Sequence, residues 1–336
     1  MEPYALRVEG LDFSIGSKRI LKNISLDIPK GVFAGIIGAN GAGKTTLLKC
    51  LNHIHEKNSG KIFVEGKELK DYGEKALAAS VSLMHQNTNL DFDFTCGQVV
   101  EFGRYPYWKK GYWAGTGDKE IVRQKMEYTR TLDMAGKNIT EISGGERQRV
   151  LFAKLLAQDT DIVLLDEPTA NMDIYYQKQI FEMGRHLTGE GRTVVAAVHD
   201  LNLALEFCTH FYLLSQGELL AQGRARDVIT PKHLKEAYRM DTLVYENPLT
   251  GCLQVFRVER TREREGEWVH IQCENGFRGS LMYDAWRKGA DVTCSPAADG
   301  SLNRWAAQVL GLDMLTEDEL SDRMVKNHKK FIRVVV

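Results

Sequence analysis

The sequence predicts an α/β protein in which helices cover the faces of a parallel sheet. Apolar, strand-length runs alternate with helix-like runs along most of the 336 residues, as such a sheet requires. One of these strands leads into a glycine-rich turn, and a charge-dense segment further on separates a smaller α/β region. With 43% hydrophobic residues, the chain can bury one large core and one small one.

The charge and hydropathy of the chain argue against several classes of protein. The formal net charge of -1 gives no support to a nucleic-acid-coating role, and no nucleic-acid partner is expected. The opening residues, MEPYALRVEG, lack the basic start and apolar run of a secretion signal. No apolar stretch approaches the ~18 residues needed to span a bilayer, so we expect a soluble chain.

The cysteine and histidine patterns do not indicate a metal site. Six cysteines stand singly, without a C-x-x-C pair, and their wide spacing favours buried, reduced thiols. His53 and His55 would face different directions on a helix, so we expect surface residues there rather than metal ligands.

The N-terminal part of the chain reads as strands followed by a helix. Alternating apolar runs at 4–15 and 20–31 precede VFAGIIGANG, and turn residues separate the three. This pattern is typical of a small sheet that leads into a buried strand. From Lys44 to Leu51 the periodicity becomes helical.

The middle of the chain continues the alternation after an irregular region. Residues 88–140 are polar, aromatic and partly helical. Beyond them the sequence predicts a helix from Gly145 to about Gln158, the strand DIVLLDE, the helix IYYQKQIFEMGRHL and the strand TVVAAVHD. We expect TVVAAVHD to lie beside the other two buried strands, with their carboxyl ends at one edge of the sheet.

A charge-dense segment, VERTREREGEW, interrupts this pattern and indicates a solvated face or a domain boundary. We therefore expect one domain at 1–257 and a small α/β domain at 266–336. The smaller one reads as the strand WVHIQCENG, the helix GSLMYDAWRKG and the strand ADVTC, then two helical stretches before FIRVVV. This order resembles half of a nucleotide-binding sheet, although Gly276 and Gly279 do not complete the glycine fingerprint.

The stretch GANGAGKTT fits the phosphate-loop pattern G-x-x-x-x-G-K-[ST], between a strand and a helix as that motif requires. Glycines let the backbone turn its N–H groups inward around a phosphate, where Cβ atoms would obstruct it. Lys44 is expected to reach the β- and γ-phosphates, and the Thr45 hydroxyl to take Mg²⁺. The predicted phosphate-binding residues are Gly38, Ala39, Asn40, Gly41, Ala42, Gly43, Lys44, Thr45 and Thr46.

Two carboxylates stand at the carboxyl end of the strand IVLLDE, where α/β sheets bind ligands. Beside a phosphate loop, Asp166 is expected to hold Mg²⁺, directly or through water, and Glu167 to orient or deprotonate the attacking water. A solvated Asp-Glu pair is the alternative. His199 emerges at the same edge, where it could contact a γ-phosphate, and Gln86 in MHQNT is a further candidate.

A second phosphate cradle lies at 141–150, in EISGGERQRV. Ser-Gly-Gly before a helix exposes backbone N–H groups at the positive end of the helix dipole, which suits a phosphate. The chain thus carries two phosphate cradles but only one set of catalytic groups.

These motifs, in this order, resemble the ATP-binding cassette (ABC) family over residues 1 to about 256. GANGAGKTT is similar to its Walker A loop, ISGGE to its signature and IVLLDE to its Walker B strand. The resemblance implies a P-loop NTPase fold of the ABC type: a mixed sheet with helices, a small antiparallel β subdomain and a helical subdomain at about 88–160. It also implies ATP hydrolysis with Mg²⁺, with the catalytic residues Lys44, Gln86, Glu167 and His199 and the metal ligands Thr45, Gln86 and Asp166.

In this family the signature closes over the γ-phosphate held by the facing subunit. The resemblance therefore implies a head-to-tail homodimer that sandwiches two ATP molecules, so that the second cradle serves the neighbour's site. The residues implied to bind ATP in trans are Ser143, Gly144, Gly145 and the D-loop residue Asp173.

Three further segments resemble one subgroup of this family. TCGQVVEFGRYPY, MDIYYQ and HDLNLALEF are similar to ATPases of importers for iron chelates, haem and cobalamin. The implied protein powers such an importer from the cytoplasmic face of the membrane, with separate permease subunits and a substrate-binding protein. The sequence departs from the family pattern at Ile142, at Asn171-Met172 and at Ile15, where an aromatic residue commonly stacks on adenine. Phe13, on the same face of that strand, is a candidate substitute.

Several alternatives stay open at this point. The stretch FGRYPYWKKGYW fits a docking surface for a membrane partner, or a helical subdomain that packs its own aromatic residues. A second possible function is that of a soluble cassette ATPase acting on a nucleic-acid or ribosomal partner, although such proteins usually carry a long coiled coil or two cassettes. A third is that of a small-molecule kinase, which would leave SGGE and His199 unexplained. Region 266–336 fits a packing appendage that widens the dimer interface, or a regulatory ligand-sensing module.

Overall fold

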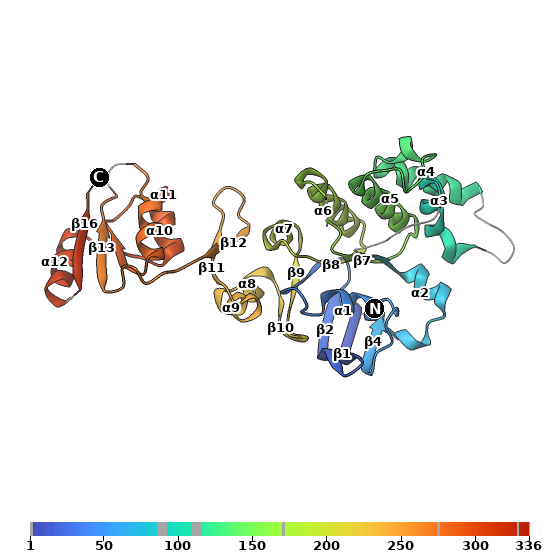
Figure 1. The fold of residues 1–336 in the computed structure, drawn as a ribbon, viewed down its shortest axis with the longest axis horizontal. Coiled ribbons are helices and arrows are strands. Elements are labelled where there is room, and N and C mark those ends of the chain that lie inside the picture. Colours follow the sequence, from blue (N-terminus) through green and yellow to red (C-terminus); the bar gives the residue numbers. More distant parts are fainter. Residues whose placement is uncertain are drawn as a thin grey trace. The chain divides into compact units, whose positions relative to one another are not determined.

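The chain folds into two compact units, Met1–Val228 and Ile229–Val336, each of which is described by itself. Figure 1 shows their elements in chain order from blue to red. The computed structural model describes residues 3–85, 93–108, 116–169, 172–273, 276–327 and 329–335.

A small antiparallel sheet opens the first unit, as the alternating sequence predicts. Its strand order is β2-β1-β4-β5, and its long central pair consists of β1 (Tyr4–Ile15) and β2 (Lys18–Pro29). The strands β4 (Ser59–Val64) and β5 (Lys67–Glu68) extend it. Apolar side chains from one face of β1 and β2, including Leu11 and Ile24, are fully buried in the main core.

The central sheet of the first unit has six strands in the order β10-β9-β3-β8-β7-β6. Five of them run parallel, and β10 pairs antiparallel with β9 at the edge, which makes the sheet mixed. The strands are β3 (Phe33–Ile37), β6 (Val81–Met84), β7 (Ile162–Asp166), β8 (Thr193–Ala197), β9 (His210–Ser215) and β10 (Glu218–Gly223). The prediction that TVVAAVHD lies beside the other two buried strands is confirmed, because β8 separates β3 from β7.

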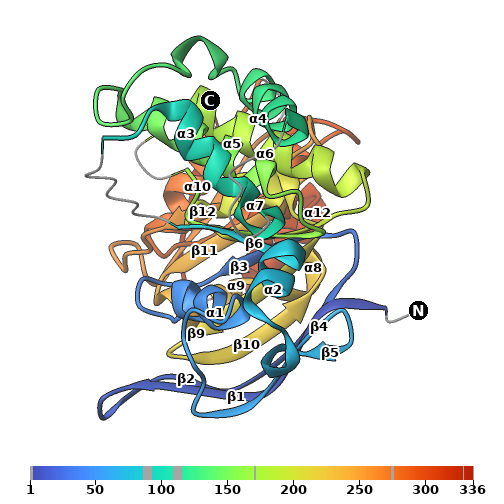
Figure 2. The same ribbon diagram turned by 90° about the vertical axis from the view of Figure 1, so that its right-hand side faces the viewer.

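Helices cover both faces of this sheet. Helix α1 (Lys44–Leu51) contacts both the small sheet, through β2, and the central strands β7 and β8, and Figure 2 shows it between the two sheets. The other helices are α2 (Glu74–Ser80), α3 (Cys96–Glu101), α4 (Thr116–Tyr128), α5 (Gly144–Ala157), α6 (Ile174–Gly189), α7 (Leu201–Phe207) and α8 (Ala225–Val228).

Three helices of the first unit, α3, α4 and α5, pack together. Helix α3 packs against α4 and α5, and Figure 2 shows the three gathered away from β1 and β2. The buried side chain of Arg104 links α4 to α5, because Nε donates to Asp118 Oδ1 at 2.8 Å and Nη1 donates to the Ala157 carbonyl at 2.8 Å.

The second unit contains a hairpin and a parallel sheet. Helix α9 (Pro231–Tyr238) precedes the antiparallel hairpin β11 (Asp241–Glu246)–β12 (Leu253–Val258). A four-stranded parallel sheet follows, in the order β15-β14-β13-β16. Its elements are β13 (Glu267–Ile271), α10 (Gly279–Arg287), β14 (Asp291–Cys294), α11 (Leu302–Leu310), β15 (Asp313–Met314), α12 (Glu317–Lys326) and β16 (Lys330–Val334).

The division between the units falls earlier than the charge pattern indicates. It lies at Val228/Ile229, whereas the charge-dense segment suggests a boundary between 257 and 266. The hairpin β11–β12 groups with the second unit because its aromatic rings pack on α10 and α11. Tyr245 lies 5.4 Å from Trp305 and Phe256 lies 5.8 Å from Tyr283, measured between ring centroids.

Candidate active site

The glycine-rich loop between β3 and α1 adopts a backbone that requires glycine. Gly38, Gly41 and Gly43 have φ of 150°, 78° and 105°, in the region that L-residues rarely adopt. A Cβ atom on Gly38 would lie 2.3 Å from the Leu214 carbonyl oxygen. Because Gly43 is the N-cap of α1 and offers no side chain, the first N–H groups of that helix stay available to an anion.

Lys44 lies folded back over this loop. Its Nζ donates to the carbonyl oxygens of Gly38 at 2.8 Å and Ala39 at 3.2 Å, and the residue is only 4% exposed. Burial lowers its pKa, while the carboxylates of Glu167 and Asp166 act in the opposite direction. The loop thus holds the lysine at its centre, where a phosphate on the N–H groups would meet the ammonium group.

Buried Asp166 and half-buried Thr45 form a hydrogen-bonded oxygen pair beside the loop. The Thr45 hydroxyl donates to Asp166 Oδ1 at 2.7 Å, and Asp166 is 1% exposed. Burial raises the pKa of Asp166, and this hydrogen bond acts in the opposite direction. No group of three or more His, Cys, Asp or Glu side chains suited to a metal ion occurs among the described residues. A hydroxyl beside one carboxylate fits Mg²⁺, which binds phosphate oxygens and few protein ligands at such loops.

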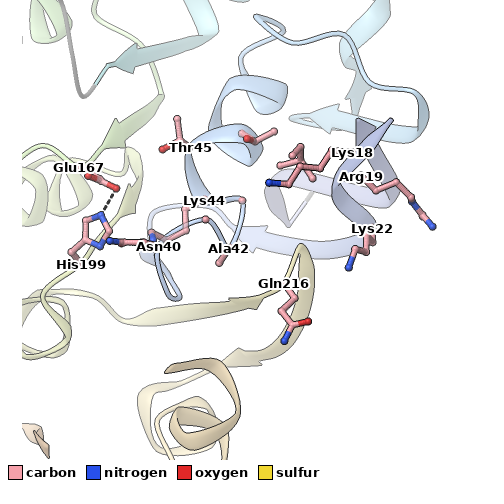
Figure 3. Close-up of a pocket in the computed structure, with 14 residues that line it drawn as sticks. Lys18, Arg19, Lys22, Asn40, Ala42, Lys44, Thr45, Glu167, His199 and Gln216 are labelled. Carbon is pink, nitrogen blue, oxygen red and sulfur yellow. Dashed lines mark hydrogen bonds and ion pairs between the residues drawn. The ribbon is translucent and has the colours of Figure 1, made fainter. Parts of the chain in front are cut away.

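Glu167 and His199 meet at the adjoining edge of the sheet. Glu167 leaves β7 with a φ of 49°, which is uncommon for a residue with a side chain. Its Oε1 is hydrogen-bonded to Nε2 of His199, which follows β8 (Figure 3). Glu167 and His199, two of the four predicted catalytic residues, are therefore direct partners.

One pocket of about 720 Å³ brings most of the predicted residues together. The predicted residues that line it are Asn40, Gly41, Ala42, Gly43, Lys44, Thr45, Thr46, Glu167 and His199. Gly38 and Ala39 contribute through their carbonyls, which hold Lys44. Figure 3 shows Glu167 and His199 at one end of the pocket and Lys18 and Lys22 at the other, with the glycine loop between them.

The lining also contains polar side chains that the sequence analysis missed. They are Lys18, Arg19, Lys22 and Gln216. The basic pair Lys18-Arg19, which begins β2, is a visible signal in the sequence, since cations near a phosphate loop favour anion binding. Gln216 had no local signal: it reaches the pocket because the β9–β10 turn packs on β2, where the Lys22 amide donates to the Gly217 carbonyl at 2.8 Å.

The signature and D-loop residues do not line this pocket. Ser143 is exposed and caps α5: its Oγ accepts from the Glu146 amide at 3.3 Å, and the Glu146 carboxylate accepts from the Ser143 amide at 2.8 Å. Gly144 and Gly145 form the first turn of that helix. Asp173 is exposed and caps α6 by accepting from the Tyr176 amide at 3.1 Å. Gln86 lies outside the described residues.

The proposed substitute for an adenine-stacking residue is corrected by the structure. Phe13 is 7% exposed, and its ring stacks on His55 at 4.9 Å between centroids, so that it does not line the pocket. Ile15, at the usual aromatic position, is 61% exposed. Phe13 and Ile15 lie on the same face of β1 but have different surroundings, because Phe13 lies deeper in the small sheet.

The comparisons with known proteins agree with this geometry. Residues 21–170 match the family model described as ABC transporter. The chain is 34% identical over 309 residues to the cobalamin import ATP-binding protein BtuD of Halobacterium salinarum, covering 91% of this chain and 77% of that protein. It is 34% identical over 263 residues to the ferric enterobactin transport ATP-binding protein FepC of Escherichia coli, covering 76% of this chain and 95% of that protein.

A solved structure carries the same fold. A chain of a metal-chelate-type ABC transporter in an inward-facing conformation superposes with a TM-score of 0.66 at 25% identity, covering 76% of this chain and 98% of that one. In the part of the chain that the structure describes, no helix has the length and apolar character to cross a membrane. The glycine loop, the Walker B carboxylates and the matched relatives lead to one conclusion: the chain belongs to the ABC transporter family, as an ATP-binding cassette that hydrolyses ATP.

Proposed function

We propose that this cassette is the ATPase subunit of an importer for an iron chelate, haem or cobalamin. The observation that carries the ATPase part is the single pocket in which Lys44, Thr45, Glu167 and His199 converge on a glycine loop. The import part is supported by the relatives, which are named for cobalamin, ferric enterobactin and hemin transport.

Each residue of the pocket has a proposed task in hydrolysis. The N–H groups of the loop and Lys44 bind the β- and γ-phosphates of ATP. Thr45 and Asp166 are the residues that would hold Mg²⁺, and when bound this ion neutralises charge that develops on the phosphates. Glu167 orients and deprotonates the attacking water, with its carboxylate steered by the hydrogen bond to His199. His199 and Gln86 are the proposed contacts to the γ-phosphate side.

A second copy of the chain would complete each site. Ser143 and Asp173 are exposed and lie outside the pocket of their own chain. The helix α5 that follows Ser143 begins with Gly144 and Gly145, and a Cβ atom on either glycine would meet nothing within 4 Å. A helix start with two glycines beside an exposed serine, outside the described pocket of its own chain, favours a head-to-tail homodimer.

The partners proposed for this dimer are membrane permease subunits at the cytoplasmic face and a substrate-binding protein. Tyr105 and Tyr107, on the 3₁₀ helix at 102–107, are 51% and 40% exposed, and such side chains are enriched at protein interfaces. Both open alternatives for this segment have support, since Tyr105 also packs edge-on against Trp108.

The experiment that tests this function is reconstitution with a permease and a substrate-binding protein of the same organism, sought first among the neighbouring genes. The full chain should co-purify with the permease, and vesicles holding the complex should accumulate one of the three ligand classes only with ATP. The Glu167→Gln complex should assemble without transporting. If the chain does not co-purify, and DNA or ribosomes stimulate its ATPase activity instead, the soluble alternative replaces this proposal.

A further inference from the structure

Two cysteines lie side by side at the carboxyl edge of the sheet in the second unit. Strands β13 and β14 pair in parallel, with Ile271 opposite Cys294. Cys273 follows two residues after Ile271, which places it on the same face as Cys294. Cys294 is fully buried in the core of this unit, whereas Cys273 is only partly buried.

Backbone contacts keep the two side chains together. The Ser295 amide donates to the Ile271 carbonyl at 3.0 Å, and the Cys273 amide donates to Ser295 Oγ at 2.8 Å. The Cys273 thiol lies 3.8 Å from the Ile271 carbonyl oxygen, within reach of a weak S–H donation. Cys273 packs against the buried cluster of this unit that contains Cys294, so both side chains belong to the same core.

The two thiols are chemically unequal. A hydrogen bond from Cys294 lowers the pKa of Cys273 to about 7, although burial acts in the opposite direction. The Ser295 hydroxyl and the Arg278 cation also lower this pKa. The same hydrogen bond, together with burial, raises the pKa of Cys294. A thiolate at the surface beside a protonated, buried thiol is the arrangement of an attacking and a resolving cysteine.

The other cysteines offer no such pair. Cys50, Cys96 and Cys208 are buried, and burial raises the pKa of each thiol. Cys252 is partly exposed and serves as the accessibility control.

We propose that Cys273 and Cys294 form a reversible redox site whose co-reactant is a low-molecular-weight disulfide of the glutathione type. The Cys273 thiolate attacks one sulfur of the disulfide, forms a mixed disulfide and releases one thiolate. Cys294 then loses its proton and attacks the Cys273 sulfur, which forms the Cys273–Cys294 disulfide and releases the second thiolate. The protein is oxidised by two electrons and the small disulfide is reduced to two thiols.

This bond would join the carboxyl ends of β13 and β14. The carboxyl ends of parallel strands are where open α/β sheets bind ligands. The site stands in the second unit and uses no residue of the ATP pocket, so it is independent of the proposed transport function.

Peptide mapping of the full-length protein tests the proposal directly. After incubation with oxidised glutathione, mass spectrometry should find the Cys273 and Cys294 peptides joined, and dithiothreitol should separate them. In Cys294→Ala the resolving thiol is absent, so Cys273 should keep a bound glutathione. In Cys273→Ala neither product should form, and Cys252→Ala should behave as the unmodified sequence. The proposal fails if the unmodified protein forms no Cys273–Cys294 bond, a result that depends on no variant folding.

The pH dependence of alkylation gives a second readout. The rate at Cys273 should rise through a midpoint near 7, below the ~8.5 of an ordinary thiol, because the thiolate is the reactive form. Replacing Cys294 by Ala should move the midpoint upward, since the S–H donor is lost. A midpoint at or above that of an ordinary thiol in the unmodified protein would overturn the assignment of Cys273 as the attacking thiol.

Discussion

At the scale of single residues, the adjacent carboxylates after β7 divide the chemistry between them. Asp166, the last residue of the strand, is buried and accepts the Thr45 hydroxyl. Glu167 turns out of the strand with a φ of 49°, which brings its carboxylate to His199 in the pocket. Without this turn, successive side chains of an extended strand would point to opposite faces. The backbone conformation is therefore part of the site.

Replacing Glu167 by Gln tests the proposed base. The amide keeps the size of the side chain but cannot accept a proton, so we expect turnover to fall by about 10²- to 10⁴-fold. ATP should still bind, and the variant should accumulate as an ATP-bound dimer on size-exclusion chromatography. Lys44→Ala is the matched control, because it should weaken ATP binding itself. Near-normal hydrolysis by Glu167→Gln would show that another group activates the water.

Replacing Thr45 by Val tests the oxygen pair. The methyl group fills the space of the hydroxyl but cannot bind a cation. We therefore expect the Mg²⁺ concentration that gives half-maximal ATPase activity to rise at least about tenfold. Thr45→Ser keeps the hydroxyl and should behave nearly as the unmodified protein. A Mg²⁺ titration of both variants makes the comparison, and equal Mg²⁺ dependence of Thr45→Val and the unmodified protein would remove Thr45 from the site.

At the scale of elements, the residues that begin helix α5 have two roles, one in stability and one in the proposed catalysis. The capping box of Ser143 and Glu146 satisfies two backbone N–H groups that the helix start would leave open. The same serine is the proposed phosphate contact in the facing subunit. A substitution at this position therefore needs a design that separates stability from catalysis.

Two substitutions at Ser143 achieve this separation. Ser143→Asp keeps an N-cap acceptor, so stability should change little, but its negative charge would face a phosphate and should reduce ATPase activity more than tenfold. Ser143→Ala removes the cap and should lower the free energy of unfolding by about 0.5–2 kcal/mol. Thermal unfolding measures the change in stability, and steady-state assays measure the change in ATPase activity. Full activity of a stably folded Ser143→Asp would contradict the phosphate contact.

Local patterns predict the elements well and the contacts between distant segments poorly. Periodicity and glycine placement suffice for β3, α1, β7 and α5, because each pattern lies within one element. Gln216 reaches the pocket, and Phe13 is removed from it, through packing that involves other segments. The pairing of Cys273 with Cys294 likewise arises from strand register rather than spacing.

At the scale of the whole molecule, the chain separates ATP chemistry from its C-terminal part. Every described residue that lines the pocket lies within the first unit. The proposed domains are 1–257 for the cassette and 266–336 for a small α/β domain, which serves as a packing appendage or as a ligand-sensing module. The segment from α9 to β12 belongs to the cassette in this proposal, whereas it belongs to the second of the two compact units in the structure.

Truncation tests the proposed domains. A chain that ends after Glu259 is expected to fold and to bind ATP with unchanged affinity, because all proposed nucleotide contacts precede that point. Dimerisation or the regulation of hydrolysis should change instead. Calorimetry with an ATP analogue and size-exclusion chromatography measure both properties. A monodisperse truncated protein that cannot bind ATP would contradict this division of labour, and a second truncation after Val228 shows whether α9 to β12 is needed.

The most direct test of the account is a crosslink between two chains. Cysteines introduced by Ser143→Cys and Asn40→Cys in one Glu167→Gln chain should couple between subunits when ATP and Mg²⁺ are present, because the signature of one chain is proposed to close over the glycine loop of the other. A denaturing gel should then show a covalent dimer that depends on ATP and disappears when Lys44→Ala is added. A bond that peptide mapping finds only within single chains, or a dimer that forms equally without ATP, would contradict the shared site.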